Sequence, residues 1–266
     1  LIDREEFIFQ KDNLRPDGFK GQIKFDNVHF SYNDTTPVFK GLSFTVNPGE
    51  TVAIVGPTGA GKTSLINLIS RYYEFQQGKI TIDNFDIRNI DIGMLRSKIA
   101  VVLQDVFLFN TTILENITIG DLKISRKEVI QAAKKVGVHE FIIQLPGGYD
   151  FEVKERGGLL SSGQRQIIAF LRAYVYQPQL LILDEATSSI DSLSEEYIQN
   201  ATEEITKSRT SIIIAHRLST IQNADSILVM DDGVIVEKGN HMELLRKKGQ
   251  YYELYQNQFI SKSHIN

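Results

Sequence analysis

The sequence predicts an α/β fold built on a parallel β-sheet, and two observations support this. Short apolar runs of the length of buried strands alternate with longer stretches of helical length. These runs are also apolar apart from Thr51 and Ser211, as expected for strands that are covered on both faces of a parallel sheet. The runs lie at 51–55, 99–103, 180–183 and 211–215.

Before and after the first run, the pattern changes to that of shorter, half-exposed strands. One such strand is expected at 22–32, and others at 42–46 and 79–83. In the strand at 22–32, alternate residues are predicted to face opposite sides. One side would carry Ile23, Phe25 and Asn27, and the other Lys24, Asp26 and Val28. Helical pieces are expected at 64–71 and 94–98. The N-terminal part therefore predicts a β-rich subdomain beside the sheet.

The middle of the chain, 105–177, predicts a helical lobe inserted between strand-rich regions. Ser125 and Glu128 form a capping box before apolar residues at helical spacing. Another helix opens at Gly163, with an apolar face that includes Ile167. Further on, a helix is expected at 193–206 and a hairpin at 227–237, turning at Asp231-Asp232-Gly233. A tyrosine-rich tail at 241–259 reads as helical.

Composition limits what this chain can be. It has 266 residues and a net charge of −4, so no basic surface for nucleic acid is indicated. It has no Cys, which excludes disulfides and thiolate metal sites. No apolar run reaches the ~20 residues of a membrane span. Because the first residue is Leu1 and residues 1–20 are polar, that segment is expected to be a linker from something longer, with one domain at 21–260 and a tail at 261–266.

The segment between the first apolar run and the first helix carries the strongest motif. It fits G-x-x-x-x-G-K-[ST] in a strand–loop–helix context. Its glycines let backbone N–H groups surround anionic oxygens, and the helix adds the positive end of its dipole. Its lysine can reach the β- and γ-phosphates, and its threonine can ligate Mg²⁺. A nucleoside-triphosphate site is therefore predicted at Gly56, Pro57, Thr58, Gly59, Ala60, Gly61, Lys62, Thr63 and Ser64.

Polar residues end three of the other apolar runs, where ligands bind in open α/β sheets. Asp184 is either the acid that holds Mg²⁺ or a helix N-cap. Glu185 is either the general base that activates the attacking water or a surface carboxylate. Gln104 would ligate Mg²⁺ and sense the γ-phosphate, although alone it would more often be an ordinary polar residue at a strand end. His216 would hydrogen-bond the γ-phosphate, although a lone His at a strand end is usually structural.

Taken together, these residues resemble the nucleotide-binding domain of ATP-binding cassette (ABC) exporters of the bacterial multidrug type. The resemblance covers about 21–259 and adds a signature at Leu160-Ser161-Ser162-Gly163-Gln164 and a D-loop at 188–191. It implies a P-loop NTPase core with an antiparallel β subdomain and an inserted helical subdomain. It also implies that Tyr32 stacks on adenine and that 153–157 is the exporter X-loop.

The resemblance further implies a mechanism and partners. Two such domains would dimerise head to tail and sandwich ATP and Mg²⁺. The phosphate loop of one domain would then face Ser161, Ser162, Gly163, Gln164 and Asp191 of the other. A transmembrane permease domain, on the same polypeptide, would place the chain at the cytoplasmic face of the cell membrane. ATP hydrolysis would drive export there, with no role for nucleic acid.

Three positions depart from the family pattern. Ser162 replaces a signature glycine, Ile167 stands where Arg is frequent, and Lys154 stands where the X-loop usually has Gly. Such changes favour one half of a heterodimeric exporter with a weakened ATP site, but a homodimer that tolerates Ser162 remains an alternative. A soluble ABC ATPase without transport, or an ATP-binding switch module, is the alternative in function. The retained Glu185 argues against the switch module.

Overall fold

The computed structural model describes residues 13–33, 36–184, 191–207, 209–215 and 217–257. Its central element is a six-stranded sheet whose strands β3, β8, β7 and β6 run parallel, as does β9 beside β3. Only β10 is antiparallel, paired with β9. In sheet order the strands are β10 (Val234–Gly239), β9 (Ser226–Asp231), β3 (Thr51–Val55), β8 (Thr210–Ile214), β7 (Leu180–Asp184) and β6 (Ile99–Val102). The predicted α/β class and the predicted hairpin are confirmed.

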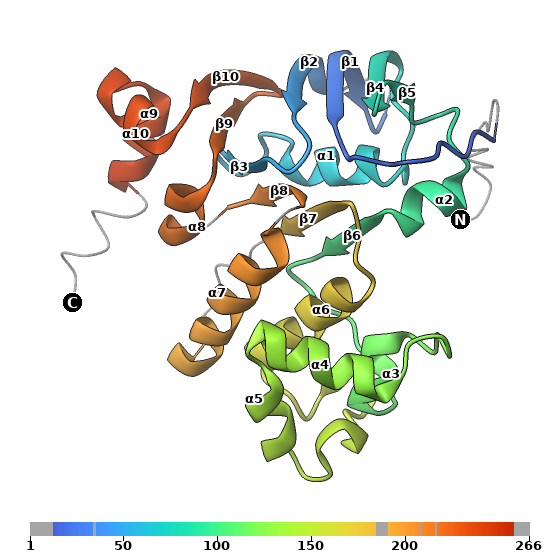
Figure 1. The fold of residues 1–266 in the computed structure, drawn as a ribbon. Coiled ribbons are helices and arrows are strands. Elements are labelled where there is room, and N and C mark those ends of the chain that lie inside the picture. Colours follow the sequence, from blue (N-terminus) through green and yellow to red (C-terminus); the bar gives the residue numbers. More distant parts are fainter. Residues whose placement is uncertain (1–12, 34–35, 185–190, 208, 216, 258–266) are drawn as a thin grey trace.

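A second, four-stranded sheet is antiparallel and lies above the first in Figure 1. Its order is β2 (Pro37–Val46), β1 (Ile23–Ser31), β4 (Gln77–Ile82) and β5 (Phe85–Asp86). Helix α1 (Lys62–Ile69) lies between the two sheets and packs its apolar residues into one core with both. The phosphate loop therefore enters a helix that is buried on two sides.

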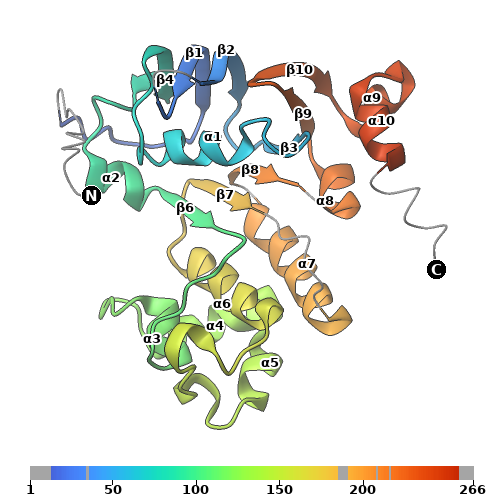
Figure 2. The ribbon, with the colours of Figure 1, turned by 180° about the vertical axis from the view of Figure 1, so that it is seen from behind.

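Alternate residues of the central strands serve two different cores. Val52 and Ile54 of β3 belong to the core around α1, whereas Ala53 and Val55 belong to the core on the other face. That second core is covered by helices α3 (Ile113–Thr118), α4 (Arg126–Val136), α5 (His139–Gln144), α6 (Ser162–Val175) and α7 (Ser192–Thr206). Helices α3 to α6 form a separate lobe, seen from both sides in Figures 1 and 2. The capping box that was predicted at Ser125 and Glu128 is confirmed at the start of α4.

Strand β1 corrects the predicted alternation. Ile23 and Phe25 are buried as expected, but Asn27 is exposed and Val28 is fully buried. The register with β2 shifts between Phe25 and Val28, and Asn27 has a positive φ of 50°. A β-bulge thus adds one residue and exchanges the two faces of the strand beyond it.

One further expectation needs correction. The run at 99–103 was expected to be a buried strand, but β6 is an edge strand, with only Val102 fully buried and Leu103 exposed. The tail at 241–259 was expected to be helical, and its described part is. It forms two helices, α9 (His241–Lys247) and α10 (Gln250–Tyr255), separated at Lys248, whose φ is 51°, and at Gly249. Residues 258–259 lie outside the described part of the chain.

Two short helices complete the fold: α2 (Ile92–Ser97) before β6 and α8 (Leu218–Asn223) before β9. Single 3₁₀ turns occur at Gly148–Asp150 and Glu155–Gly157. Among the described residues, no helix combines the length and apolar character that crossing a membrane requires.

Candidate active site

The phosphate loop uses glycine where its backbone is left-handed. Gly56, Gly59 and Gly61 have φ angles of 154°, 87° and 102°. Gly61 is also the N-cap of α1, which receives no side-chain cap. The first N–H groups of a helix have no partner inside the helix. Those of α1 are therefore not satisfied by a capping side chain, as a phosphate-binding helix start requires.

Close packing adds a second reason for two of these glycines. A Cβ atom at Gly56 would lie 2.0 Å from the carbonyl oxygen of Met230. One at Gly61 would lie 2.7 Å from Cε1 of Phe39. Gly59 has no atom within 4 Å of such a Cβ, so only its backbone conformation calls for glycine. The loop is thus wedged between β2 and β9 and not free to widen.

Lys62 and Asp184 form the charged centre of the site. The Nζ of Lys62 donates to the carbonyl oxygens of Gly56 and Pro57, both at 2.8 Å. Burial lowers the pKa of Lys62, and the charge of Asp184 opposes this shift. Burial likewise raises the pKa of Asp184; Lys62 opposes that shift and Asp105 adds to it. Each group therefore stabilises the charged form of the other in a partly dehydrated place.

A cleft of 370 Å³ brings the phosphate loop and two of the predicted strand-end residues together. This volume lies in the range of small-molecule sites. Strands β3, β8, β7 and β6 are neighbours, so their carboxyl ends meet at one edge. The cleft is lined by Val38, Thr58, Gly59, Gly61, Lys62, Thr63, Ser64, Gln104, Asp184 and Ile214.

Three of these residues offer the oxygen ligands that Mg²⁺ prefers: the hydroxyl of Thr63, the amide of Gln104 and the carboxylate of Asp184. No cluster of three or more His, Cys, Asp or Glu side chains that could hold a metal occurs among the described residues. The donor set therefore fits an ion that shares its coordination with phosphate and water. It does not suit a metal held by protein alone.

Two predicted catalytic residues, Glu185 and His216, lie outside the described residues. They follow Asp184 of β7 and Ala215 after β8, respectively. Both strands end at the edge that carries the cleft.

Tyr32 stands beside the start of α1 and does not line the cleft. Its hydroxyl donates to Oγ of Ser64 at 3.0 Å and accepts from Nδ2 of Asn67 at 2.9 Å. Its ring lies edge to face against Phe30 and Tyr73, each with a centroid separation of 4.8 Å. The residue is 40% exposed.

The signature residues form a helix start of their own, away from the cleft lining. Ser161 caps α6, accepting from the Gln164 backbone N–H at 3.2 Å, while Gln164 Oε1 accepts from the Ser161 N–H at 2.9 Å. Ser162 is exposed and Gly163 is buried. Asp191 likewise caps α7 by accepting from the Ser194 N–H at 2.8 Å. None of these residues lines the phosphate cleft.

Comparison with known proteins decides the family. The family described as "ABC transporter" matches residues 39–188. The chain belongs to the ABC transporter family. It is 50% identical over 234 residues to a "Fatty acid ABC transporter ATP-binding/permease protein" of Mycobacterium tuberculosis, covering 88% of this chain and 37% of the relative. It is 49% identical to an "ATP-dependent lipid A-core flippase" of Saccharophagus degradans, covering 90% of this chain and 41% of the relative.

A solved structure supports the same assignment for the fold. The bacterial Atm1-family ABC exporter with ATP bound superposes with a TM-score of 0.85 at 42% identity. The match covers 93% of this chain and 43% of that one. The chain thus spans about two fifths of the length of these ABC relatives and has the fold of their ATP-binding domain.

Two departures from the ABC pattern have visible structural consequences. Ile167 is fully buried in the core of the helical lobe, where a charge could not be accommodated without a partner. Lys154 has φ 61° and ψ −175°, a region that is almost exclusive to glycine. The next residue but one, Arg156, is also left-handed, with φ 52°.

Sequence reasoning missed two residues near the ABC site, Val38 and Asp105, and the role of Asn116 in the helical lobe. Val38 lines the cleft, and Asp105 raises the pKa of Asp184. Asn116 is fully buried, and its side chain bonds both the N–H and the carbonyl of Phe109. Asp105 directly follows Gln104, so its adjacency was a usable signal. Val38 and Asn116 gave none, because apolar and amide residues at such positions are common.

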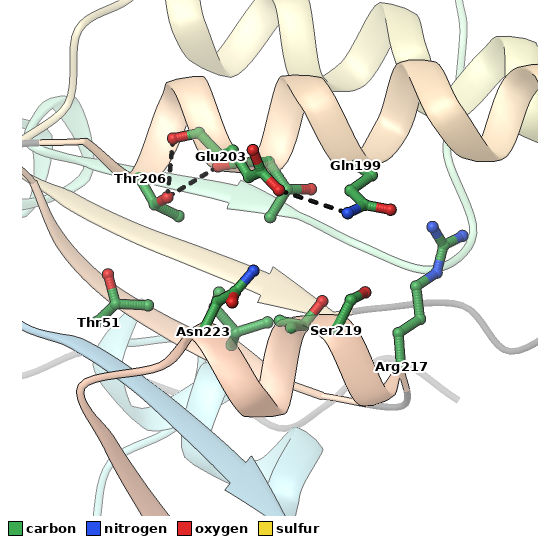
Figure 3. Close-up of a pocket in the computed structure, with 10 residues that line it drawn as sticks. Thr51, Gln199, Glu203, Thr206, Arg217, Ser219 and Asn223 are labelled. Atoms are coloured by element: carbon green, nitrogen blue, oxygen red, sulfur yellow. Dashed lines mark hydrogen bonds between the residues drawn. The ribbon is translucent and has the colours of Figure 1, made fainter. Parts of the chain in front are cut away.

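A second cavity lies between α7 and α8, over Thr51 of β3 and Ile213 of β8 (Figure 3). Its volume is 70 Å³, room for a few water molecules and not for a nucleotide. Thr202, Glu203 and Thr206 line it from α7, and Ser219 and Asn223 from α8. It contains no residue of the phosphate loop, so it is separate from the nucleotide site.

Proposed function

We propose that this chain is the ATP-hydrolysing motor domain of an ABC exporter. The observation that carries the proposal is the single cleft that joins the phosphate loop, Gln104 and Asp184. Membership of the ABC transporter family supports ATP as the nucleotide.

The phosphate loop would bind the triphosphate through its backbone N–H groups and Lys62. An ammonium group has three N–H donors, and Lys62 uses two on the loop carbonyls, which leaves one for a phosphate oxygen. The uncapped start of α1 adds favourable dipole charge. Tyr32, at the same helix start, would supply the aromatic surface for the adenine.

Thr63, Gln104 and Asp184 would hold Mg²⁺, which neutralises charge that develops on the phosphate oxygens. Glu185 would act as general base. It would accept a proton from the water whose oxygen attacks the γ-phosphorus, while the bond to the β–γ bridging oxygen breaks to give ADP and inorganic phosphate. His216 would donate a hydrogen bond to the γ-phosphate.

Completion of the site would require a second ABC domain. The signature residues and Asp191 lie away from this chain's own cleft, so they are available to a second domain that docks head to tail. Ser162, at the start of α6, would approach the partner's γ-phosphate with a side chain in place of a glycine's hydrogen. We favour a heterodimeric exporter for this reason, with a homodimer as the alternative.

A transmembrane permease domain, on the same polypeptide, would couple this motor to export at the cytoplasmic face of the membrane. The relatives named as ATP-binding/permease proteins support this arrangement. An exposed aromatic pair follows Gln104: Phe107 and Phe109, with ring centroids 5.2 Å apart, are 55% and 50% exposed. Such a pair beside Gln104 is a suitable contact for an apolar segment of the permease.

The test compares the wild-type chain with Glu185→Gln. Both should bind Mg-ATP with similar affinity, but only the wild type should release phosphate, at a rate per chain that rises with protein concentration. Hydrolysis by Glu185→Gln at the wild-type rate would refute the assigned general base. Failure of the wild type to bind Mg-ATP would refute the proposed function as a whole.

The dimer type is tested on the Glu185→Gln background by light scattering with Mg-ATP. An ATP-dependent dimer of this chain alone would favour the homodimer. A chain that binds ATP but stays monomeric, and dimerises once Ser162→Gly is added, would favour the heterodimer. In the heterodimer, the partner would supply the intact signature.

A further inference from the structure

The turn of the β9–β10 hairpin lies in close contact with the backbone of β2. Gly233, at this turn, has a φ of +78°. A Cβ atom there would lie 1.9 Å from the carbonyl oxygen of Val38 and 3.2 Å from Cα of Phe39. An ion pair between Asp232 and Lys40 joins the same two segments. Backbone cannot yield as the end of a long side chain can, so this contact fixes the separation of the hairpin and β2.

That part of β2 borders the phosphate loop on its other side. Phe39 is buried, and its Cε1 lies 2.7 Å from where a Cβ of Gly61 would be. Cγ1 of Val38 lies 3.4 Å from the same point, and Val38 lines the cleft. A contact chain therefore runs from Gly233 through Val38 and Phe39 to Gly61, the N-cap of α1.

The hairpin also lies close to the phosphate loop just before its turn. Met230, which precedes the turn in β9, places its carbonyl oxygen 2.0 Å from where a Cβ of Gly56 would be. The hairpin and β2 therefore border the phosphate loop at two of its glycines, Gly56 and Gly61. A side chain at position 233 that separates the hairpin from β2 changes the space in which the loop is held.

We propose that Gly233 is a positioning residue for the phosphate loop, acting through Val38 and Phe39 on Gly61. The inference rests on the proposed binding of ATP at that loop. A side chain at position 233 pushes β2 toward Gly61 and displaces the backbone N–H groups that surround phosphate. The affinity for the phosphates falls, whereas contacts with the base are unaffected.

Gly49 provides a matched control. Its φ is +77°, and it also lies in a turn, before β3, but no atom lies within 4 Å of a Cβ placed there. Gly49→Ala and Gly233→Ala therefore carry the same left-handed backbone strain. Only Gly233→Ala adds a collision with Val38. Any difference between them in nucleotide binding reports that contact.

The experiment measures displacement of a fluorescent ATP analogue by Mg-ATP and by Mg-tripolyphosphate, which lacks the base. Gly49→Ala should match the wild type within ~2-fold, while Gly233→Ala should lose ~10-fold or more toward both competitors, because small displacements of binding groups have large effects. Urea unfolding establishes that both variants are folded. Equal affinities of the two variants overturn the inference; lack of binding by the wild type overturns the proposed function instead.

A second substitution tests the route. Phe39→Leu removes the ring edge beside Gly61 and should return most of the lost affinity in the Gly233→Ala background, giving a clear non-additive term in the double-mutant cycle. Strictly additive effects overturn the proposed route. If Gly233→Ala does not fold, Phe39→Leu alone must alter tripolyphosphate affinity by ~3-fold or more. An unchanged affinity then overturns the inference.

Discussion

Helices α1 and α6 both begin beside glycine, yet the two helix starts are built in opposite ways. The loop before α1 has glycine at each of its left-handed positions and no side-chain cap. Helix α6 is capped by its own Ser161 and Gln164, and the loop before it places Lys154 and Arg156 at left-handed positions. The first has no side-chain cap and is open to a ligand, whereas in the second the Gln164 N–H is already bonded to the Ser161 side chain.

This difference between the two helix starts suggests how the association of two ABC domains could depend on bound ATP. A helix start with unsatisfied N–H groups binds phosphate without help from another domain. A self-capped start has fewer N–H groups left for phosphate, because its capping side chain already accepts from one of them. We infer that this chain's own cleft dominates nucleotide binding and that α6 contributes only when a second domain supplies a bound triphosphate.

The largest expected effect is on nucleotide affinity, at the uncapped start of α1. Lys62→Met keeps the apolar part of the side chain but removes a charge-assisted bond to phosphate, worth roughly 1.5–3 kcal/mol. The affinity of the isolated chain for Mg-ATP should fall by about 100-fold. Arg165→Met on α6 is the control and should leave binding unchanged. Comparable losses in the two variants, measured by titration calorimetry, would contradict the proposed division of labour.

Substitutions at Lys154, in the loop before α6, should change the free energy of unfolding. Lys154→Gly relieves an arrangement that costs an L-residue about 1–3 kcal/mol and adds glycine's entropy cost of about 0.5–1 kcal/mol. The free energy of unfolding in urea should therefore rise by about 1 kcal/mol. Lys154→Ala removes the same exposed ion pair with Glu152 but stays strained, so it should show no gain. A gain of equal size in both variants would assign the effect to the charge.

The cap of α6 should matter for stability and not for nucleotide binding. Ser161→Ala removes the acceptor for the Gln164 N–H and should lower the free energy of unfolding by about 1 kcal/mol. Ser162→Ala, one residue further on and exposed, should change it by less than about 0.5 kcal/mol. Both should bind Mg-ATP like the wild type. If either isolated variant bound Mg-ATP more weakly than the wild type, α6 would have to contact the nucleotide cleft of the same chain.

Much of the site could be predicted from sequence because it depends on strand ends. The runs before Gly56, Gln104 and Asp184 are apolar, and consecutive parallel strands present their carboxyl ends to one edge. The topology then brings these three positions together without further information. The same reasoning was applied to Glu185 and His216, which lie outside the described residues.

Features that depend on neighbours distant in sequence could not be predicted. The bulge at Asn27 coincides with a close approach of Gly78 on the neighbouring strand, where a Cβ would lie 2.2 Å from the Asn27 carbonyl oxygen. Arg71 was expected only as the end of a helix, yet it is fully buried, paired with Glu74 and bonded to the carbonyl of Ile87. Periodicity describes one element at a time, whereas these positions are decided by contacts between elements.

The smallest expected effect is on the pH dependence of stability. It distinguishes Asp184, which lines the cleft, from Asp191, which caps α7. Burial raises the pKa of Asp184 in the fold, against the opposing charge of Lys62. A carboxyl group whose pKa is raised in the folded state adds to the free energy of unfolding at pH values below its unfolded-state pKa. This contribution is lost as the pH rises through the folded-state pKa. Asp184→Asn should therefore be more stable than the wild type at neutral pH, by less than about 1 kcal/mol after solvent screening. The difference should vanish as the pH falls toward the carboxyl range.

Asp191 is the matched case with the opposite sign. Hydrogen bonds from Ser194, first of all from its backbone N–H, lower the pKa of Asp191, so its stabilising effect is present at neutral pH and is lost as pH falls through the lowered value. Asp191→Asn should therefore lose stability at neutral pH and converge on the wild type in acid. Urea unfolding of both variants between pH 4 and 8, without Mg²⁺ or nucleotide, gives the two signs. If Asp184→Asn also loses stability at neutral pH, the attraction between Asp184 and Lys62 outweighs the cost of burying the carboxylate.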